Sequence, residues 1–391
     1  MKILLKNSKI YGGDTADILV EDGRIAGIGS YDTADEIHDM SGYASVLPGV
    51  IDAHMHIVTG AIEYNDRALR AWAQAGVTTV RDLGMGNDKT EHPTQEFLRY
   101  RETIEVPECA HCLTAGRFVA QWHGLNHVMM DGAETGYGVK TPEDAAAAVN
   151  ELIDMGCDGI KTSVGRGMDG KSEVLDVPKL RAIADTAKKR GVWCTAHVLD
   201  SELVPRLLEA GIPEFAHMPT DHMPDELLRQ MADQGVTCTP TLCTIKAPAP
   251  PLPKGAKMPP MPKMPAGMPP MPKIDKDEQE KTVIDNTRRF VEFGGMVAVG
   301  TDTMRMESQP HVACMPVREM QLLHAAGLTV PQVIDAATIN GAKLCKIDGQ
   351  VGSIAVGKQA NIIAVRDEID ETFEALSHVE FVMNRGKVIK S

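Results

Sequence analysis

The sequence predicts an α/β protein in which a (β/α)8 barrel of the TIM type is joined to a small β-sandwich built from both termini. Short apolar runs alternate with helix-like segments through the middle of the chain, and strand-like runs occupy both ends. Strands that alternate with helices form parallel sheets through right-handed crossovers, so we expect the middle of the chain to close into a barrel. The chain has 391 residues, which suits a barrel of about 250 residues plus a second element.

The terminal segments favour strands without covering helices. Residues 1–11 alternate between apolar and polar side chains, and residues 16–29 have the pattern of a hairpin around Asp22-Gly23. Residues 352–365 and 379–389 repeat this pattern with glycine turns, so pairing of the two halves would give a sandwich. The predicted division is a composite β-domain of residues 1–50 and 346–391 and a barrel of residues 51–345, which carries a Met/Pro-rich insertion at 246–273.

The elements of the barrel follow from hydrophobic periodicity. Apolar residues at helical spacing, each group followed closely by a glycine, predict helices over residues 145–155, 177–190, 201–210 and 224–234. Short apolar runs predict strands over residues 47–56, 158–163, 191–197, 212–216, 236–242 and 296–301.

Residues able to bind metal stand at the ends of these predicted strands. His54 and His56 are two apart, so both imidazoles would point to one face of a strand. A histidine pair alone is equally compatible with hydrogen-bonded core residues. Four further strand ends carry Lys161, His197, His217 and Asp302. Because the carboxyl ends of barrel strands meet at one mouth, we expect these residues to converge there.

Composition narrows the classes of partner. The chain has 40 Lys and Arg against 54 Asp and Glu, and the net charge of −14 disfavours nucleic acid and acidic membrane surfaces. No apolar run approaches the ~20 residues of a membrane span, and residues 1–11 lack the pattern of a signal peptide. We therefore expect a cytoplasmic enzyme with a small-molecule substrate, assembled as a homo-oligomer. The eight cysteines are expected to be reduced thiols.

The Met/Pro-rich insertion leaves a non-enzymatic alternative open. Met258, Met261 and Met264 would share one face of a polyproline II helix, and thioethers suit copper(I). A copper-binding protein is therefore one hypothesis. The interpretation we favour is an adaptable apolar cover or subunit contact, because the insertion follows a predicted strand at the carboxyl face of the barrel.

The chain resembles the amidohydrolase superfamily along nearly its whole length. The resemblance rests on the terminal β-domain, the strand-end residues named above, the motif Gly300-Thr301-Asp302 and the closing segment 336–342. It is strongest with the branch related to prolidase and imidazolonepropionase. Two departures bear on the substrate: Gln121-Trp122-His123-Gly124 stands where the branch often has Gly-Gly-His-Gly, and Ala216 replaces a glutamate before His217.

The resemblance implies two divalent metal ions. His54 and His56 would bind the more buried ion, and His197 and His217 the more exposed one. Lys161 would bridge both as a carbamate, because an unmodified ammonium has no lone pair. Asp302 would ligate the buried ion and act as general base for the bridging hydroxide. Zinc suits these ligands, while manganese, cobalt and iron remain open.

The same resemblance implies hydrolysis of an amide C–N bond in a small substrate, such as a dipeptide or an N-acyl amino acid. Cyclic-amide hydrolysis or deamination of a heterocycle is the alternative, although deaminases of this superfamily usually lack the bridging lysine. His123 is a candidate for substrate binding or oxyanion stabilisation. Arg166 and Arg305 could bind a substrate carboxylate, and the interpretation of solvated loop charges stays equally open for both.

Overall fold

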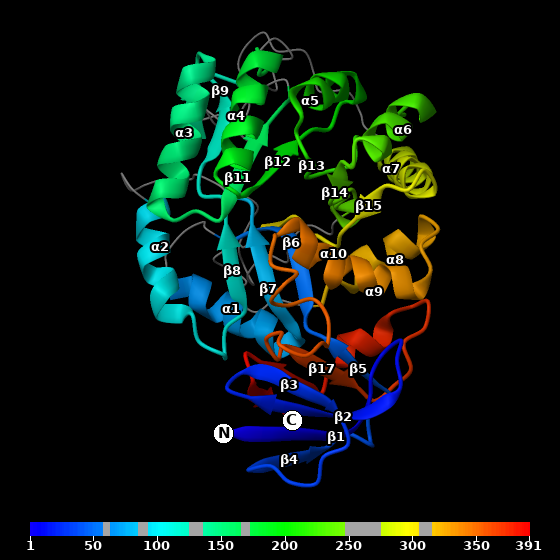
Figure 1. The fold of residues 1–391 in the computed structure, drawn as a ribbon. Coiled ribbons are helices and arrows are strands. Elements are labelled where there is room, and N and C mark those ends of the chain that lie inside the picture. The colour runs from blue at the N-terminus through cyan, green and yellow to red at the C-terminus, as the bar shows by residue number, and fades with distance from the viewer. Residues whose placement is uncertain (58–62, 85–92, 125–135, 166–172, 247–274, 305–314) are drawn as a thin grey trace, which may run out of the picture.

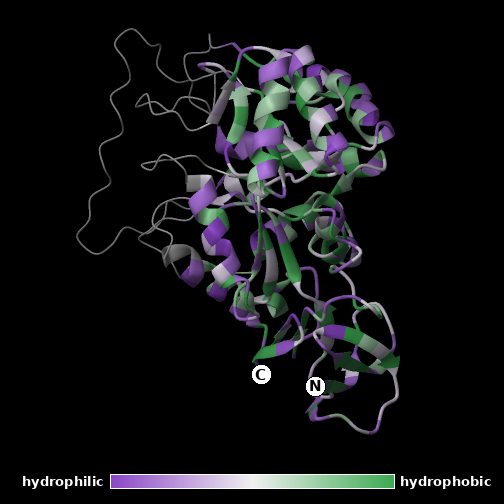
Figure 2. Cartoon of the chain, turned by 60° about the vertical axis from the view of Figure 1, so that its left-hand side comes forward, coloured by the Kyte–Doolittle hydropathy of each residue, from purple (hydrophilic) through white to green (hydrophobic). Residues whose placement is uncertain are grey.

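The computed structural model describes residues 1–57, 63–84, 93–124, 136–165, 173–246, 275–304 and 315–391. A barrel surrounded by helices forms the larger part, and strands from both termini lie together at one end of it (Figure 1). Hydrophobic residues dominate the barrel strands, whereas hydrophilic residues are frequent on the surrounding helices (Figure 2). The predicted combination of a barrel with a β-layer from both termini is confirmed.

The terminal layer consists of two four-stranded sheets. One has the order β3-β2-β1-β4, with β1 Lys2–Lys9, β2 Thr15–Glu21, β3 Arg24–Gly29 and β4 Glu36–Asp39. The other has the order β19-β18-β17-β5, with β5 Ser45–Pro48, β17 Ile362–Val365, β18 Phe381–Asn384 and β19 Lys387–Lys390. The second sheet pairs β5 from the N-terminal half directly with β17 from the C-terminal half.

Side chains from both sheets share one core, as a sandwich requires. Ile3 and Ile18 of the first sheet belong to the same buried cluster as Ile362 and Phe381 of the second. The hairpin prediction is confirmed, and Asp22-Gly23 forms its turn with φ angles of 50° and 79°. Over residues 352–365, where strands with glycine turns were predicted, the left-handed glycine turns are present and the strand is limited to Ile362–Val365. The domain boundaries at residues 50 and 346 stay a prediction.

The barrel strands are parallel and fall into two hydrogen-bonded sheets. The first contains β16 Thr303–Met304, β6 Val50–His56, β7 Val77–Asp82 and β8 His111–Thr114. The second contains β10 Gly136–Val139, β9 Phe118–Gln121, β11 Gly159–Ser163, β12 Trp193–His197, β13 Glu214–Phe215, β14 Thr237–Cys238 and β15 Met296–Val297. Backbone hydrogen bonds of 2.9 Å join the two sheets from Ala53 N to Val299 O and from Asp158 N to Thr114 O, so the barrel closes.

The helices pack around the barrel in chain order. They are α1 Glu63–Ala75, α2 Pro93–Ile104, α3 Pro142–Met155, α4 Val177–Lys189, α5 Val204–Ala210, α6 Asp225–Asp233, α7 Lys276–Glu292, α8 Val317–Ala325, α9 Val330–Ala336 and α10 Ile339–Leu344. The described residues also form three short 3-10 helices, which are η1 Ser201–Leu203, η2 Leu242–Thr244 and η3 Glu374–His378. Helix α3 shows why helix boundaries can be predicted from the sequence. Thr141 and Asp144 form a capping box at its start, and Gly156 ends it with φ 110°.

Within the described ranges, no helix combines the length and apolar character needed to cross a membrane. The seven cysteines of the described part of the chain are all free thiols, in agreement with the prediction of reduced cysteines.

Candidate metal centre

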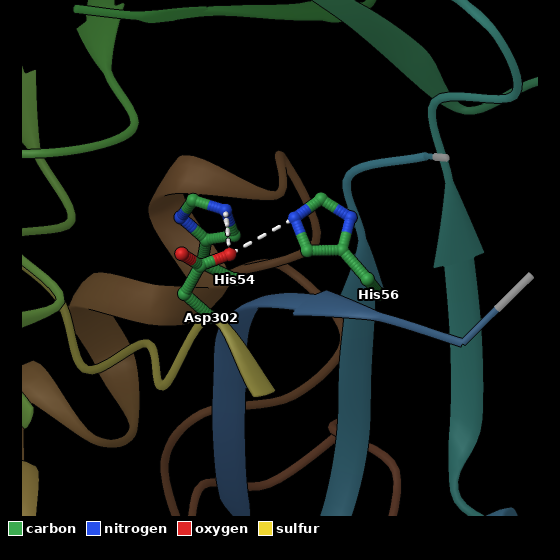
Figure 3. A group of neighbouring side chains, drawn as sticks. All are labelled: His54, His56 and Asp302. Atoms are coloured by element: carbon green, nitrogen blue, oxygen red, sulfur yellow. Dashed lines mark ion pairs between the residues drawn. The ribbon is translucent and has the colours of Figure 1, made fainter. Parts of the chain in front are cut away.

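The end of β6 and the segment after β15 form the centre of the candidate site. Thr301 and Asp302 donate backbone hydrogen bonds of 3.1 and 2.7 Å to His54 O, which fixes this segment beside β6. Asp302 Oδ1 lies 3.2 Å from His54 Nε2 and 2.9 Å from His56 Nε2 (Figure 3). The potential ligand atoms of the three residues all lie within 4.8 Å of one another, so they could hold a metal ion.

The hydrogen bonds of the two histidines show that this group fits a cation. His54 Nδ1 donates to Ala216 O at 2.8 Å, and His56 Nδ1 donates to Gly84 O at 2.5 Å, because a carbonyl oxygen only accepts. Burial lowers the pKa of His54 to about 3, so its Nε2 carries a lone pair at neutral pH. A lone pair that faces a carboxylate oxygen is repulsive unless a cation lies between them. Backbone carbonyls that orient ligand histidines in this way are common at metal sites.

A second pair of histidines adjoins the first. The ring of His217 lies 4.7 Å from that of His54 and 4.6 Å from that of His197, measured between centroids. Burial lowers the pKa of His197 to about 3 and that of His217 well below its usual value. His217 Nδ1 lies 2.8 Å from Thr241 Oγ1. Neutral imidazoles are the form that binds metal. The second ion that the resemblance implies at these two residues stays a prediction.

Lys161 on β11 is the most unusual residue of the centre. Its side chain is 1% exposed, and its Nζ has no hydrogen-bond partner among the residues that the structure describes. Burial lowers the pKa of Lys161 to about 7. Lys161 pairs in register with Thr195, two residues before His197, so Lys161 and His197 lie on the same face of the sheet. Besides burial, the charge of Lys161 lowers the pKa of both His54 and His197. An unpaired buried ammonium is costly, so this environment favours an uncharged or chemically modified lysine.

Three non-glycine residues near the ends of the barrel strands have left-handed backbone: His123, Thr241 and Asp302, with φ of 55°, 54° and 50°. Such conformations are uncommon for residues with a Cβ and cluster at functional sites. His123 is the third residue of a turn closed by a 2.8 Å hydrogen bond from Gly124 N to Gln121 O, and its side chain is exposed. Its ring lies 4.8 Å from that of Trp122. A role of His123 in binding substrate stays a prediction.

The predicted substrate arginines, Arg166 and Arg305, lie outside the described residues, and so does the Met/Pro-rich insertion beyond Lys246. Lys246 itself forms ion pairs of 2.7 and 2.6 Å with Asp277 and Glu280 at the start of α7.

Asp52 is a supporting residue that the sequence did not single out. Its carboxylate accepts hydrogen bonds from Thr301 N at 3.1 Å and Thr301 Oγ1 at 2.7 Å, so it holds the residue that precedes Asp302. The available signal was its position two residues before His54, which places it on the same face of the strand.

Arg81 and Glu214 form a second support beneath the centre. The guanidinium of Arg81 is buried and pairs with both carboxylate oxygens of Glu214, while its Nε donates to Ala53 O at 2.6 Å. This pair ties β7 to β13 and to the backbone next to His54. Neither residue could be paired from the sequence, where they are separated by 133 positions.

The model of the amidohydrolase family matches residues 45–390, which include every described residue of the centre. This chain belongs to the amidohydrolase family. The fold and the resemblance expected from the sequence are thereby confirmed, and so is the expectation of a hydrolase. Members of this family generally use divalent metal ions, which agrees with the group formed by His54, His56 and Asp302.

Matches to relatives and to solved structures cover almost the whole of this chain. An imidazolonepropionase from Geobacillus sp. (strain WCH70) is 23% identical over 439 aligned positions, which cover 98% of this chain and 92% of the relative. A crystal structure of an Xaa-Pro dipeptidase with bound methionine superposes with a TM-score of 0.78 at 22% identity, and the match covers 100% of both chains. A putative prolidase from Bifidobacterium longum has a TM-score of 0.75 at 24% identity, covering 99% of this chain and 94% of the other.

Proposed function

We propose that this amidohydrolase cleaves an amide C–N bond of a small substrate, a dipeptide or an N-acyl amino acid, at a centre of two divalent metal ions. The observation that carries the proposal is the grouping of three buried histidines and the half-buried His197 next to Asp302, together with the buried amine of Lys161, which has no hydrogen-bond partner among the described residues.

The donor set supports a division into two ion sites. His54, His56 and Asp302 would hold one ion, and His197 and His217 the other. Lys161 would bridge them after its neutral amine adds to carbon dioxide, which forms an N–C bond and releases one proton. A pKa of about 7 leaves a large share of this amine neutral at neutral pH, as the addition requires. Zinc suits the nitrogen and oxygen donors, and manganese, cobalt and iron remain open.

When bound, two such ions polarise a substrate carbonyl and make a water molecule more acidic. The chain itself supplies the proton acceptor. The carboxylate of Asp302, which lies 3.2 Å from His54 Nε2 and 2.9 Å from His56 Nε2, is ionised at neutral pH like an ordinary aspartate and would stand beside the ions. It would take a proton from the attacking water and deliver it to the leaving nitrogen. Asp52, through Thr301, keeps this carboxylate at the mouth of the barrel.

Substrate binding would fall to side chains other than the proposed metal ligands. We assign His123 to the carbonyl oxygen, and Arg166 and Arg305 to a substrate carboxylate. The solved neighbour that acts as an Xaa-Pro dipeptidase supports a dipeptide or a similar amide.

Hydrolysis of a cyclic amide is the second candidate, favoured by the similarity to imidazolonepropionase over 98% of this chain. Deamination of a heterocycle is less consistent with the buried lysine. The copper hypothesis depends on residues 246–273 and has no support from the described residues.

Hydrolysis assays with the zinc- and manganese-loaded protein, on panels of dipeptides, N-acyl amino acids and cyclic amides, test this proposal. We expect turnover on one of the two acyclic classes, with its loss in Asp302→Asn at unchanged metal content. Turnover confined to cyclic amides would establish the second candidate. One ion per chain together with an unmodified Lys161 by intact mass would contradict the proposed centre.

A further inference from the structure

Glu319 is a buried carboxylate outside the proposed metal ligands. It lies on α8 with no exposed surface, and no Lys, Arg or His of the described ranges forms an ion pair with it. Its Oε1 accepts from Leu242 N at 3.0 Å and its Oε2 from Cys243 N at 2.8 Å. Burial raises the pKa of Glu319 to about 7, whereas these two donors act in the opposite direction and favour the carboxylate. Burying a carboxylate without an ion-pair partner costs free energy, which its two hydrogen bonds must offset.

The two hydrogen bonds of Glu319 satisfy the first N–H groups of η2, which is an N-cap supplied from another helix. Thr241, the residue before η2, has a left-handed backbone with φ 54° and ψ 42°. This conformation is unfavourable for a β-branched residue, so the surrounding structure must impose it. The hydrogen bonds from Leu242 N and Cys243 N to Glu319 hold η2 against α8 and thereby fix the turn at Thr241.

This turn presents the Thr241 hydroxyl to His217. Its Oγ1 lies 2.8 Å from His217 Nδ1, which leaves Nε2 on the side of the ring that faces away from Thr241. The neighbouring Cys243 also reaches the centre, since its thiol donates to Thr301 O at 3.5 Å, next to Asp302. Of these two contacts, only the one between Thr241 and His217 leads directly to a proposed ligand, whereas that of Cys243 ends on the backbone of Thr301.

We propose that Glu319 is a positioning residue for the metal centre: by fixing the backbone of Thr241, it orients His217 and raises the affinity for the ion held by His197 and His217. The inference rests on the proposed centre of two ions. Hydrogen-bonded partners of ligand histidines set ring orientation and basicity, and their loss typically lowers metal affinity about 10- to 100-fold.

The test is Glu319→Gln, which preserves side-chain size but offers one acceptor oxygen in place of two. We expect the affinity for the more weakly bound zinc ion to fall about tenfold or more, while the ion at His54, His56 and Asp302 is retained. Zinc competition with a chelator and metal analysis, both at about pH 8 where Glu319 is ionised, give the two affinities without any measurement of activity.

Asp17→Asn is the matched control. Asp17 is likewise a buried carboxylate that accepts two backbone hydrogen bonds, from Asn7 N at 2.9 Å and Tyr31 N at 3.0 Å, but it lies in the terminal sandwich. The control should lower the unfolding midpoint and leave both zinc affinities unchanged. A role of Glu319 in stability alone would make the two variants behave alike.

Variants of Thr241 test the route of the effect and serve if Glu319→Gln folds poorly. Thr241→Val removes the hydroxyl and should lower the affinity for the same zinc ion. Thr241→Ser keeps the hydroxyl, so its zinc affinity should stay near that of the wild type. The double variant Glu319→Gln/Thr241→Val should bind zinc no more weakly than Thr241→Val alone, because both act through one contact.

Additive losses in the double variant, or two unchanged affinities in Glu319→Gln, would overturn the inference about Glu319. Fewer than two zinc ions in the wild-type chain would instead contradict the centre of two ions, and with it the basis of this inference.

Discussion

Replacement of Lys161 by Met should stabilise the metal-free protein. Methionine has a similar length and no charge, whereas Lys161 places an amine with 1% exposure where no described residue accepts its hydrogen bonds. Burial lowers the pKa of this amine from 10.5 to about 7, a difference of about 3.5 units. At about 1.36 kcal/mol per unit, the lysine costs the metal-free fold up to about 5 kcal/mol.

The sign of the pH dependence follows from the direction of this shift. Between pH 7 and 10.5 the unfolded chain binds the proton that the folded chain has lost at Lys161, so the contribution of Lys161 to the stability of the wild-type protein becomes less unfavourable as the pH rises across this window. Below about pH 7 the penalty is complete. Lys161→Met lacks this titration, and its advantage in free energy of unfolding should shrink as the pH rises toward 10.5.

Urea unfolding of chelator-treated wild-type and Lys161→Met protein at about pH 6, 8 and 10 measures the difference. In parallel, the variant should bind fewer metal ions, since the bridging ligand is gone. A variant that is no more stable than wild type at about pH 6, or a difference that does not change with pH, would refute the reasoning and show that Lys161 is compensated in the metal-free fold.

Three further predictions concern the proposed base and the residues that support the centre. Asp302→Asn should lower turnover about 10²- to 10⁴-fold with metal content largely intact, and near-normal turnover of a fully metallated variant would assign the base elsewhere. Asp52→Asn weakens the hold on Thr301 and should lower kcat about tenfold with little change in KM; an unchanged kcat would contradict a positioning role. Glu214→Ala leaves the guanidinium of Arg81 buried without its partner and should lower the free energy of unfolding by about 3–5 kcal/mol, most of which the double variant with Arg81→Met should recover; a single-variant cost under about 1 kcal/mol would show that the pair is dispensable.

Local periodicity accounts for the parts of the structure that the sequence predicted well. The helix expected over 177–190 is observed as Val177–Lys189, and the strand expected over 191–197 as Trp193–His197. Apolar spacing and capping residues act over a few positions, so they can be read without knowledge of the fold. Of the strands with glycine turns expected over residues 352–365, Ile362–Val365 is formed, and the segment between the left-handed glycines at 352 and 357 is not extended into a strand.

The sequence by itself determined the barrel, the terminal β-layer and which side chains stand at the strand ends. His54 and His56 share a face because strand geometry repeats every two residues. Only the tertiary structure decided which groups support these side chains. Glu319 and Leu242 are 77 positions apart, and Glu319 alone resembles any acidic residue of a helix. The isolation of the Lys161 amine likewise exists only after the barrel closes, because burial is a property of packing between elements that are distant in the chain.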